Sequence, residues 1–169
     1  KINGSVDLES EPGKGSQIII KLPLTIAIIQ ALMVEVERSI FAIPLSTVIE
    51  AVRISRSEIK TINGREVLHL RDRVLPLIRL AQEFDIPTDS NRERFYVVVA
   101  ALGDRRVGVV VDELRSQEEV VIKSIWDYLE TVKGVSGATI TGEGKVVLIL
   151  DTSELVQNAQ AWHNPGIAA

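Results

Sequence analysis

Residues 102–111 read Leu102-Gly103-Asp104-Arg105-Arg106-Val107-Gly108-Val109-Val110-Val111. The Gly-Asp pair is typical of a tight turn, and the apolar run behind it indicates a strand buried on both faces. The stretch Val36–Leu45 has the same pattern of strand, polar turn and strand. A second pair of similar stretches is Val74–Leu80 and Val146–Thr152. Because both pairs occur in the same order, the chain contains an internal repeat, and we expect two related β-barrels.

The segment between the repeats is polar and contains Pro87, so we predict a surface connection over about residues 85–93. The first barrel is then expected over about 26–86 and the second over about 95–150. Asp151 followed by Glu154 is a variant of the capping box, and it predicts a C-terminal helix over about 152–162. Residues 163–169 are expected to be a frayed tail.

Composition supports a mainly β fold and limits the chemistry. Of the 169 residues, 46% are hydrophobic but only 4% are aromatic, and isoleucine and valine dominate the apolar set. Such β-branched side chains favour strands. Cysteine is absent and only two histidines occur, so disulfides and thiolate metal sites are excluded and we expect no metal site. The net charge of −4 gives no electrostatic support for binding nucleic acid.

The first residues do not belong to the repeat. Residues 5–9 place Val6 and Leu8 on one face, and residues 17–22 place Ile18, Ile20 and Leu22 on one face. A Pro- and Gly-containing turn at 11–16 separates the two stretches. An isolated hairpin is only marginally stable in water. We therefore expect this hairpin to be the edge of another domain or to be buried by a partner, including self-association with a second copy.

No apolar stretch approaches the ~20 residues needed to span a bilayer, and no signal pattern is seen at the first residues. The expectation from the sequence is a cytoplasmic protein without direct membrane insertion.

Several motifs carry a resemblance to a known family. They are Gly4-Ser5, Glu9–Ser16, Ile20–Thr25, Ile26–Leu32, Gly108–Leu114 and Val120–Lys123. Together they resemble the CheA-type chemotaxis histidine kinases. The resemblance implies that residues 1–25 are the terminal hairpin of an α/β ATP-binding domain. It implies that residues 26–162 are a CheW-like regulatory domain of two SH3-like, five-stranded barrels.

The same resemblance implies a function in two-component signal transduction. The regulatory domain would bind a CheW-like coupling protein and the cytoplasmic tip of chemoreceptors, and couple them to an ATP-dependent protein-histidine kinase. The ATP-binding boxes and the phosphoacceptor domain are not in this sequence, so we expect no catalysis by this chain. ATP and Mg would belong to the parent kinase. Gly13, Gly15 and Ser16 would lie at the edge of its ATP site, although a plain structural turn explains them too.

We predict a partner-binding patch in the segment 49–62, which is more apolar than a short crossing segment needs. Its predicted anchors are Ile49, Val52, Ile54, Ile59 and Ile62. The alternative is that these side chains fill the space between the two barrels.

Other candidate groups have plain structural explanations. His69 is expected to be a surface histidine, and the acidic residues Asp112, Glu113, Glu118 and Glu119 a solvated loop. Two other functions stay open: a stand-alone CheW-type adaptor, against which the hairpin argues, and a nucleic-acid-binding barrel, against which acidity and scarce aromatics argue.

Overall fold

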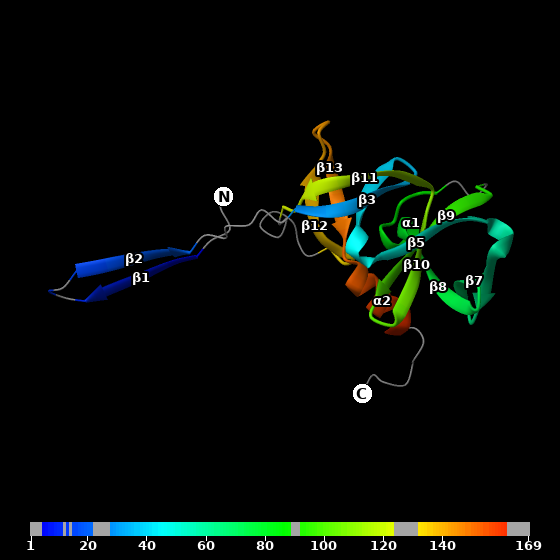
Figure 1. Cartoon of the computed structure of the whole chain (residues 1–169), viewed down its shortest axis with the longest axis horizontal. Helices are drawn as coiled ribbons and strands as arrows, with labels where there is room; N and C mark the ends of the chain where they lie inside the picture. Colours follow the sequence, from blue (N-terminus) through cyan, green and yellow to red (C-terminus); the bar gives the residue numbers. More distant parts are fainter. Residues whose placement is uncertain are drawn as a thin grey trace.

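The structure is a computed structural model, and it describes residues 5–11, 13, 15–21, 28–88, 92–123 and 132–161. Strands β1 (Ser5–Glu11) and β2 (Gly15–Lys21) form the expected hairpin as an antiparallel sheet of their own (Figure 1). Leu8 and Ile18 face each other across it and are 67% and 63% exposed. That another domain or a second copy covers them stays a prediction. The side chains of Val6, Ile20 and Leu22 lie outside the described residues.

Barrel A is a five-stranded sheet in the order β11-β3-β4-β13-β12. Its strands are β3 (Ile28–Val36), β4 (Ser39–Pro44), β11 (Glu113–Val121), β12 (Val135–Ile140) and β13 (Val146–Leu150). Lys123, just after β11, exchanges two backbone hydrogen bonds of 2.8 and 3.1 Å with Ala138 on β12. This bridge brings the two edge strands together and closes the sheet.

Barrel B has the strand order β5-β9-β10-β8-β7-β6. Its strands are β5 (Val48–Ser55), β6 (Ile59–Ile62), β7 (Arg65–Leu70), β8 (Arg73–Arg79), β9 (Arg94–Leu102) and β10 (Arg105–Val111). Only the 3₁₀ turn η2 (Arg56–Glu58) separates β5 from β6. The two edge strands are therefore one bent run of chain, and barrel B is also built from five runs. The expected mainly β fold with two five-stranded barrels is confirmed.

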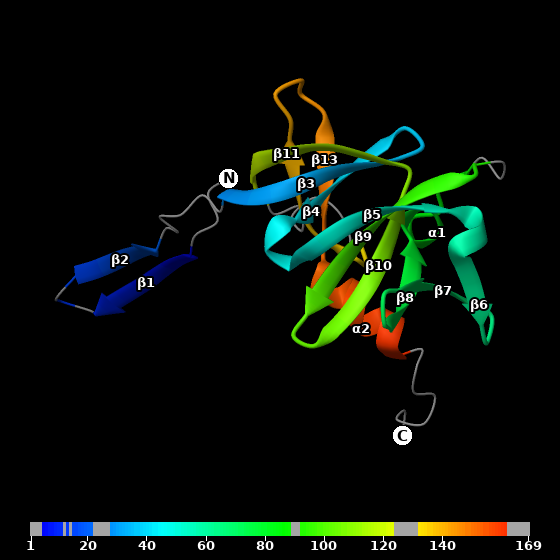
Figure 2. The ribbon, with the colours of Figure 1, turned by 45° about the vertical axis from the view of Figure 1, so that its right-hand side comes forward.

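The barrels do not follow the predicted division of the chain into 26–86 and 95–150. Barrel A combines β3 and β4 with β11 to β13, and barrel B combines β5 to β8 with β9 and β10. The chain crosses from A to B through η1 (Leu45–Thr47), and it crosses back at Asp112, between β10 and β11 (Figure 2). Each repeat therefore contributes strands to both barrels, and a boundary between repeats is not a boundary between barrels.

The internal repeat itself appears in the strand register. Aligning Val36 with Leu102 makes Ala42 equivalent to Gly108, and aligning Val74 with Val146 makes Leu77 equivalent to Ile149. In the structure Ala42 pairs with Ile149 across the parallel strands β4 and β13. Gly108 pairs with Leu77 across the parallel strands β10 and β8. The two barrels thus contain the same junction in the same register.

Three buried clusters explain the scarcity of polar residues on the central strands. On β9, Phe95, Val97 and Val99 fill the interior of barrel B, whereas Val98 and Ala100 face the core shared between the barrels. A third cluster, which includes Met33 and Ile149, fills barrel A. Strands buried on both faces give continuous apolar runs, as the run at 107–111 predicts.

Two short helices cover the shared core. The predicted C-terminal helix is α2 (Thr152–Ala161), which packs on β8, β9 and β10 (Figure 2). The Asp151 carboxylate accepts the Glu154 N–H at 3.0 Å, as the capping pattern predicts. Helix α1 (Leu80–Glu83) has only four residues. The reason is that β8 continues to Arg79, which pairs with Val110. Residues 162–169 lie outside the described part.

Candidate protein-interaction surface

The five predicted anchors separate into two groups. Ile54 is only 5% exposed, and Val52 and Ile59 pack against the same interior cluster of barrel B. The prediction of a surface patch is therefore wrong for Ile54, because alternation along β5 turns residues 52 and 54 inward. The alternative prediction, that these side chains fill the space between the two barrels, is wrong for Val52, Ile54 and Ile59. These three fill the interior of barrel B. Ile49 and Ile62 are exposed, at 46% and 52%, but lie at opposite ends of barrel B.

A hollow lies at the end of barrel B where β8 and β10 begin. These parallel strands pair only over Leu77–Arg79 and Gly108–Val110. Before those residues the strands diverge, and they leave a hollow of about 540 Å³. Its lining is Arg73, Val74, Leu75, Pro76, Asp104, Arg105 and Arg106.

We call this end of barrel B the turn face, and define it by those seven residues together with Leu102. Val74 is 55% exposed and Leu102 is 36% exposed, although both are large apolar side chains. Next to the hollow is a second one of about 190 Å³, which shares Arg73, Leu75 and Arg106 with it. Exposed apolar side chains bordered by charges are typical of protein-interaction sites.

A second set of exposed apolar side chains crosses barrel A. Ile28 is opposite Val121 on β3 and β11, and Ile140 is opposite Val146 on β12 and β13. Their exposed fractions run from 38% for Val121 to 68% for Val146. Val146 is the repeat equivalent of Val74, so both barrels expose a valine where the corresponding strand begins.

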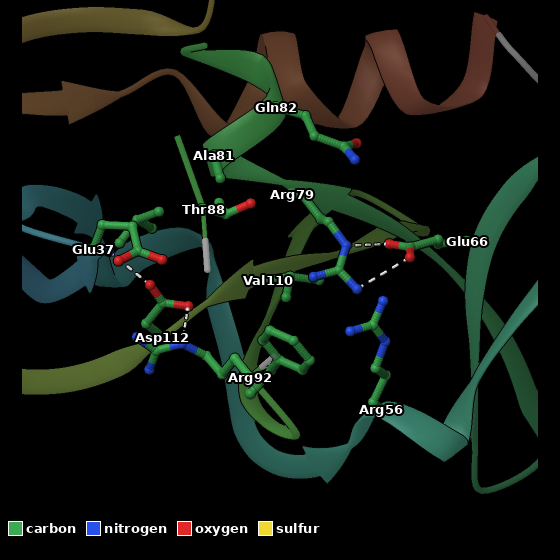
Figure 3. A pocket seen from close by; sticks show the side chains of 12 residues that line it. Glu37, Arg56, Glu66, Arg79, Ala81, Gln82, Thr88, Arg92, Val110 and Asp112 are labelled. Carbon is green, nitrogen blue, oxygen red and sulfur yellow. Dashed lines mark hydrogen bonds and ion pairs between the residues drawn. The ribbon is translucent and has the colours of Figure 1, made fainter. Parts of the chain in front are cut away.

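A pocket of about 230 Å³ between the barrels contains charged side chains that are already paired (Figure 3). Arg79 donates two hydrogen bonds to Glu66, at 2.5 and 3.0 Å, and its guanidinium lies 4.7 Å from the centre of the Phe95 ring. A bidentate pair of this kind fixes the position of the arginine. This part of the pocket therefore holds β7 and β8 against β9.

Asp112 lies at the other side of the same pocket and is 9% exposed (Figure 3). Its carboxylate accepts the backbone N–H of Glu37 at 2.6 Å and lies 3.2 Å from Nε of Arg92. The prediction of a solvated loop is wrong for Asp112, which joins the β3–β4 turn of barrel A to the segment that enters barrel B. Glu113, Glu118 and Glu119 have exposed side chains, as predicted, but they lie on strand β11 and not in a loop.

Two smaller features of barrel B are defined by local structure. Ser55 and Glu58 form a capping box around η2, in which the Ser55 N–H donates to the Glu58 carboxylate at 2.7 Å. Hydrogen bonds from the backbone and the hydroxyl of Ser55 lower the pKa of Glu58 below 4.5. His69 is exposed on β7, as expected for a surface histidine.

The hairpin turn shows why glycines occur in it. Gly13 and Gly15 have φ of +82° and +118°, which side chains rarely adopt. Ser16 pairs with Ser10 in the strand register. That these three residues border an ATP site stays a prediction. Among the described residues no group of three or more acidic or histidine side chains could hold a metal ion. No helix in that part of the chain is long and apolar enough to cross a membrane.

Comparison with known proteins identifies the family. The sequence pattern of the CheW-like domain matches residues 30–160, which is most of the chain and includes the strands of both barrels except the first two residues of β3. The chain belongs to the CheW-like domain family. The crystal structure of the scaffolding protein TtCheW from Thermoanaerobacter tengcongensis has the same fold, with a TM-score of 0.64 over 74% of this chain and 90% of that one, at 16% identity.

Larger proteins that contain a similar region are chemotaxis kinases. The chain is 48% identical over 163 residues to the sensor histidine kinase CheAY of Helicobacter pylori. It is 42% identical over 156 residues to the chemotaxis protein CheA of Bacillus subtilis. These matches cover 95% and 92% of this chain but only 20% and 23% of those proteins. The chain thus spans about a fifth of the length of the relatives it matches.

Proposed function

We propose that this chain is the regulatory part of a CheA-type chemotaxis kinase, and that it docks a CheW-like coupling protein through the turn face of barrel B. The observation that carries the docking site is the exposure of Val74 and Leu102 beside an open hollow. Both residues lie in paired strands, and the described part of the chain still leaves their side chains exposed.

The match to CheAY supports a kinase origin over a stand-alone adaptor. It covers 95% of the chain, whereas the CheW-like pattern begins only at residue 30. The similarity therefore extends into the hairpin β1–β2. In this proposal the hairpin is the end of the ATP-binding domain, and the regulatory domain passes signals from the chemoreceptor tip to the kinase.

The docking site is tested by calorimetric titration of the chain with a CheW-like coupling protein. Val74→Asp places a charge in the proposed contact, which costs about 2 kcal/mol or more if the contact excludes water, or about 30-fold in Kd. The matched control is Ile62→Asp, which is as exposed but lies at the opposite end of barrel B. We expect Val74→Asp to lose binding and Ile62→Asp to bind normally, with both melting close to the wild type. Equal binding by both variants would place the contact elsewhere.

The kinase activity of the parent has a separate test. We propose that this chain alone neither binds ATP measurably nor phosphorylates itself, because ATP and Mg are held by the upstream part of the parent. Calorimetric titration with Mg-ATP is expected to show no heat of binding. Micromolar binding that is lost in Gly15→Ala would instead show that the hairpin turn contacts the nucleotide.

A further inference from the structure

The turn face carries arginines that the rest of the chain does not neutralise. Within the described residues, the guanidinium groups of Arg73, Arg105 and Arg106 form no hydrogen bond or ion pair. Arg106 is half-buried and lines both hollows. The lining of the larger hollow has these three arginines against a single carboxylate, that of Asp104. A local excess of positive charge therefore lies on a chain whose net charge is −4.

Four other arginines of the chain are held by carboxylates. Arg79, Arg92 and Arg115 each pair with a carboxylate. Arg71, which borders the smaller hollow, pairs with Glu50 at 2.9 Å. Arg38, Arg53 and Arg94 also form no ion pair with a carboxylate among the described residues, so what distinguishes the turn face is that three such arginines line one hollow.

The internal repeat shows that the fold does not need these charges. At the equivalent start of β4 in barrel A, Ser39 and Ile40 occupy the places of Arg105 and Arg106. Ser39 and Ile40 begin β4, which pairs with β13 in parallel, and Arg105 and Arg106 begin β10, which pairs with β8 in parallel. These are the equivalent parallel junctions of the two barrels. Barrel A therefore forms this junction with a hydroxyl and an apolar side chain at these positions.

Arg73, the third arginine of the turn face, can be compared with barrel A in the same way. Lys145 is the barrel A equivalent of Arg73, and its ammonium pairs with Glu143 at 2.9 Å. Barrel A thus neutralises its cation at this place, and barrel B does not.

We infer that the turn face recognises carboxylates on its docking partner, with Arg73, Arg105 and Arg106 as the residues that determine specificity. This inference rests on the proposed docking site and names the chemistry of the partner's surface. An apolar contact made around Val74 brings the partner's carboxylates within reach of the three guanidinium groups. Arginine suits this role because its planar fork binds a carboxylate through two hydrogen bonds.

A protein surface fits the hollow better than a nucleic acid does. Val74, Leu75 and Pro76 supply an apolar floor, which a phosphate backbone would leave uncovered. The hollow has no aromatic side chain on which a base could stack. The partner's surface therefore needs both acidic and apolar groups.

The test compares charge reversal at the turn face with the same change elsewhere. The variant combines Arg105→Glu with Arg106→Glu, and the control is Arg94→Glu at the opposite end of β9, which is also exposed. Each protein is titrated with a CheW-like coupling protein at 50 and 300 mM NaCl. We expect the double variant to bind at least tenfold more weakly at 50 mM and to lose most of the salt dependence that the wild type and control show.

Each result has a distinct meaning. If Val74→Asp abolishes binding while the double variant binds like Arg94→Glu, the docking site stands and the carboxylate inference is overturned. If neither Val74→Asp nor the double variant differs from its control, the docking site itself is in error. A 20-nucleotide single-stranded DNA is the probe for a general polyanion site. Tight DNA binding that competes with the coupling protein and depends on the same arginines would overturn recognition of a protein carboxylate.

Discussion

Asp112 joins the two barrels. Replacing it with asparagine should show how much this contact contributes to the free energy of unfolding, without changing the interior of either barrel. The carboxylate is 9% exposed and has two partners, the Glu37 N–H at 2.6 Å and the Arg92 guanidinium at 3.2 Å. Asparagine has one acceptor oxygen in the same space. Whichever way the amide is turned, its NH₂ group faces one of two donors. Asp112→Asn therefore loses one hydrogen bond to a charged group and leaves a donor without an acceptor.

A hydrogen bond to a charged group contributes about 1.5–3 kcal/mol. Since Arg92 is about a third exposed, water takes over part of its interaction, and we expect a loss near the lower end of that range. For a chain of this size each kcal/mol lowers Tm by roughly 2–4 °C, so the expected fall is about 3–8 °C. Thermal melts followed by circular dichroism give the measurement.

The control for this experiment is Glu113→Gln, which removes the same charge from the next residue. Glu113 is exposed on β11, and such surface changes stay within about 0.5 kcal/mol. If the Tm of Asp112→Asn lies within 1 °C of the Tm of this control, the Asp112 carboxylate does not hold the barrels together.

Further predictions concern the barrel B interior and the β5–β6 turn. Gly108→Ala should destabilise the chain by about 1–3 kcal/mol, because the added Cβ would lie 2.6 Å from Cδ2 of Leu77; chemical denaturation measures the loss, and an unchanged midpoint would contradict this packing. Ile54→Ala should cost about 2–5 kcal/mol, whereas Ile62→Ala should be nearly neutral, and equal midpoints for the two variants would argue against the inward position of Ile54. The lowered pKa of Glu58 predicts a stabilising effect that is present above the carboxyl's unfolded pKa and is lost as the pH falls through its folded pKa, below 4.5. NMR titration of the carboxyl should locate that pKa, and a value at or above 4.5 would exclude the capping box in solution.

The sequence predicts the local units of this fold well. The hairpin turns, the strand buried on both faces at 107–111 and the Asp151 cap all depend on neighbouring residues, and all three are present in the structure. The repeat is visible as well, because equivalent strands need the same apolar pattern to fill equivalent barrels.

The exchange of strands between the barrels could not be predicted in this way. Crossing segments such as η1 and Asp112 have no sequence pattern that says which sheet the next strand joins. Alternation along β5 places Ile54 and Val52 on one face and Ile49 on the other. The inward position of Ile54 could therefore have been predicted from the sequence. No sequence pattern indicates the burial of Asp112, because its partners Glu37 and Arg92 are distant in the sequence.

Amide hydrogen exchange of the chain with and without a CheW-like coupling protein shows which barrel the partner covers. Docking at the turn face is expected to slow exchange at residues 73–75 and 102–106, and to leave the β6–β7 turn at Asn63 and Gly64 unchanged. Protection limited to β12 and β13 of barrel A, where Ile140 and Val146 are exposed, would contradict it and place the coupling protein on the other barrel.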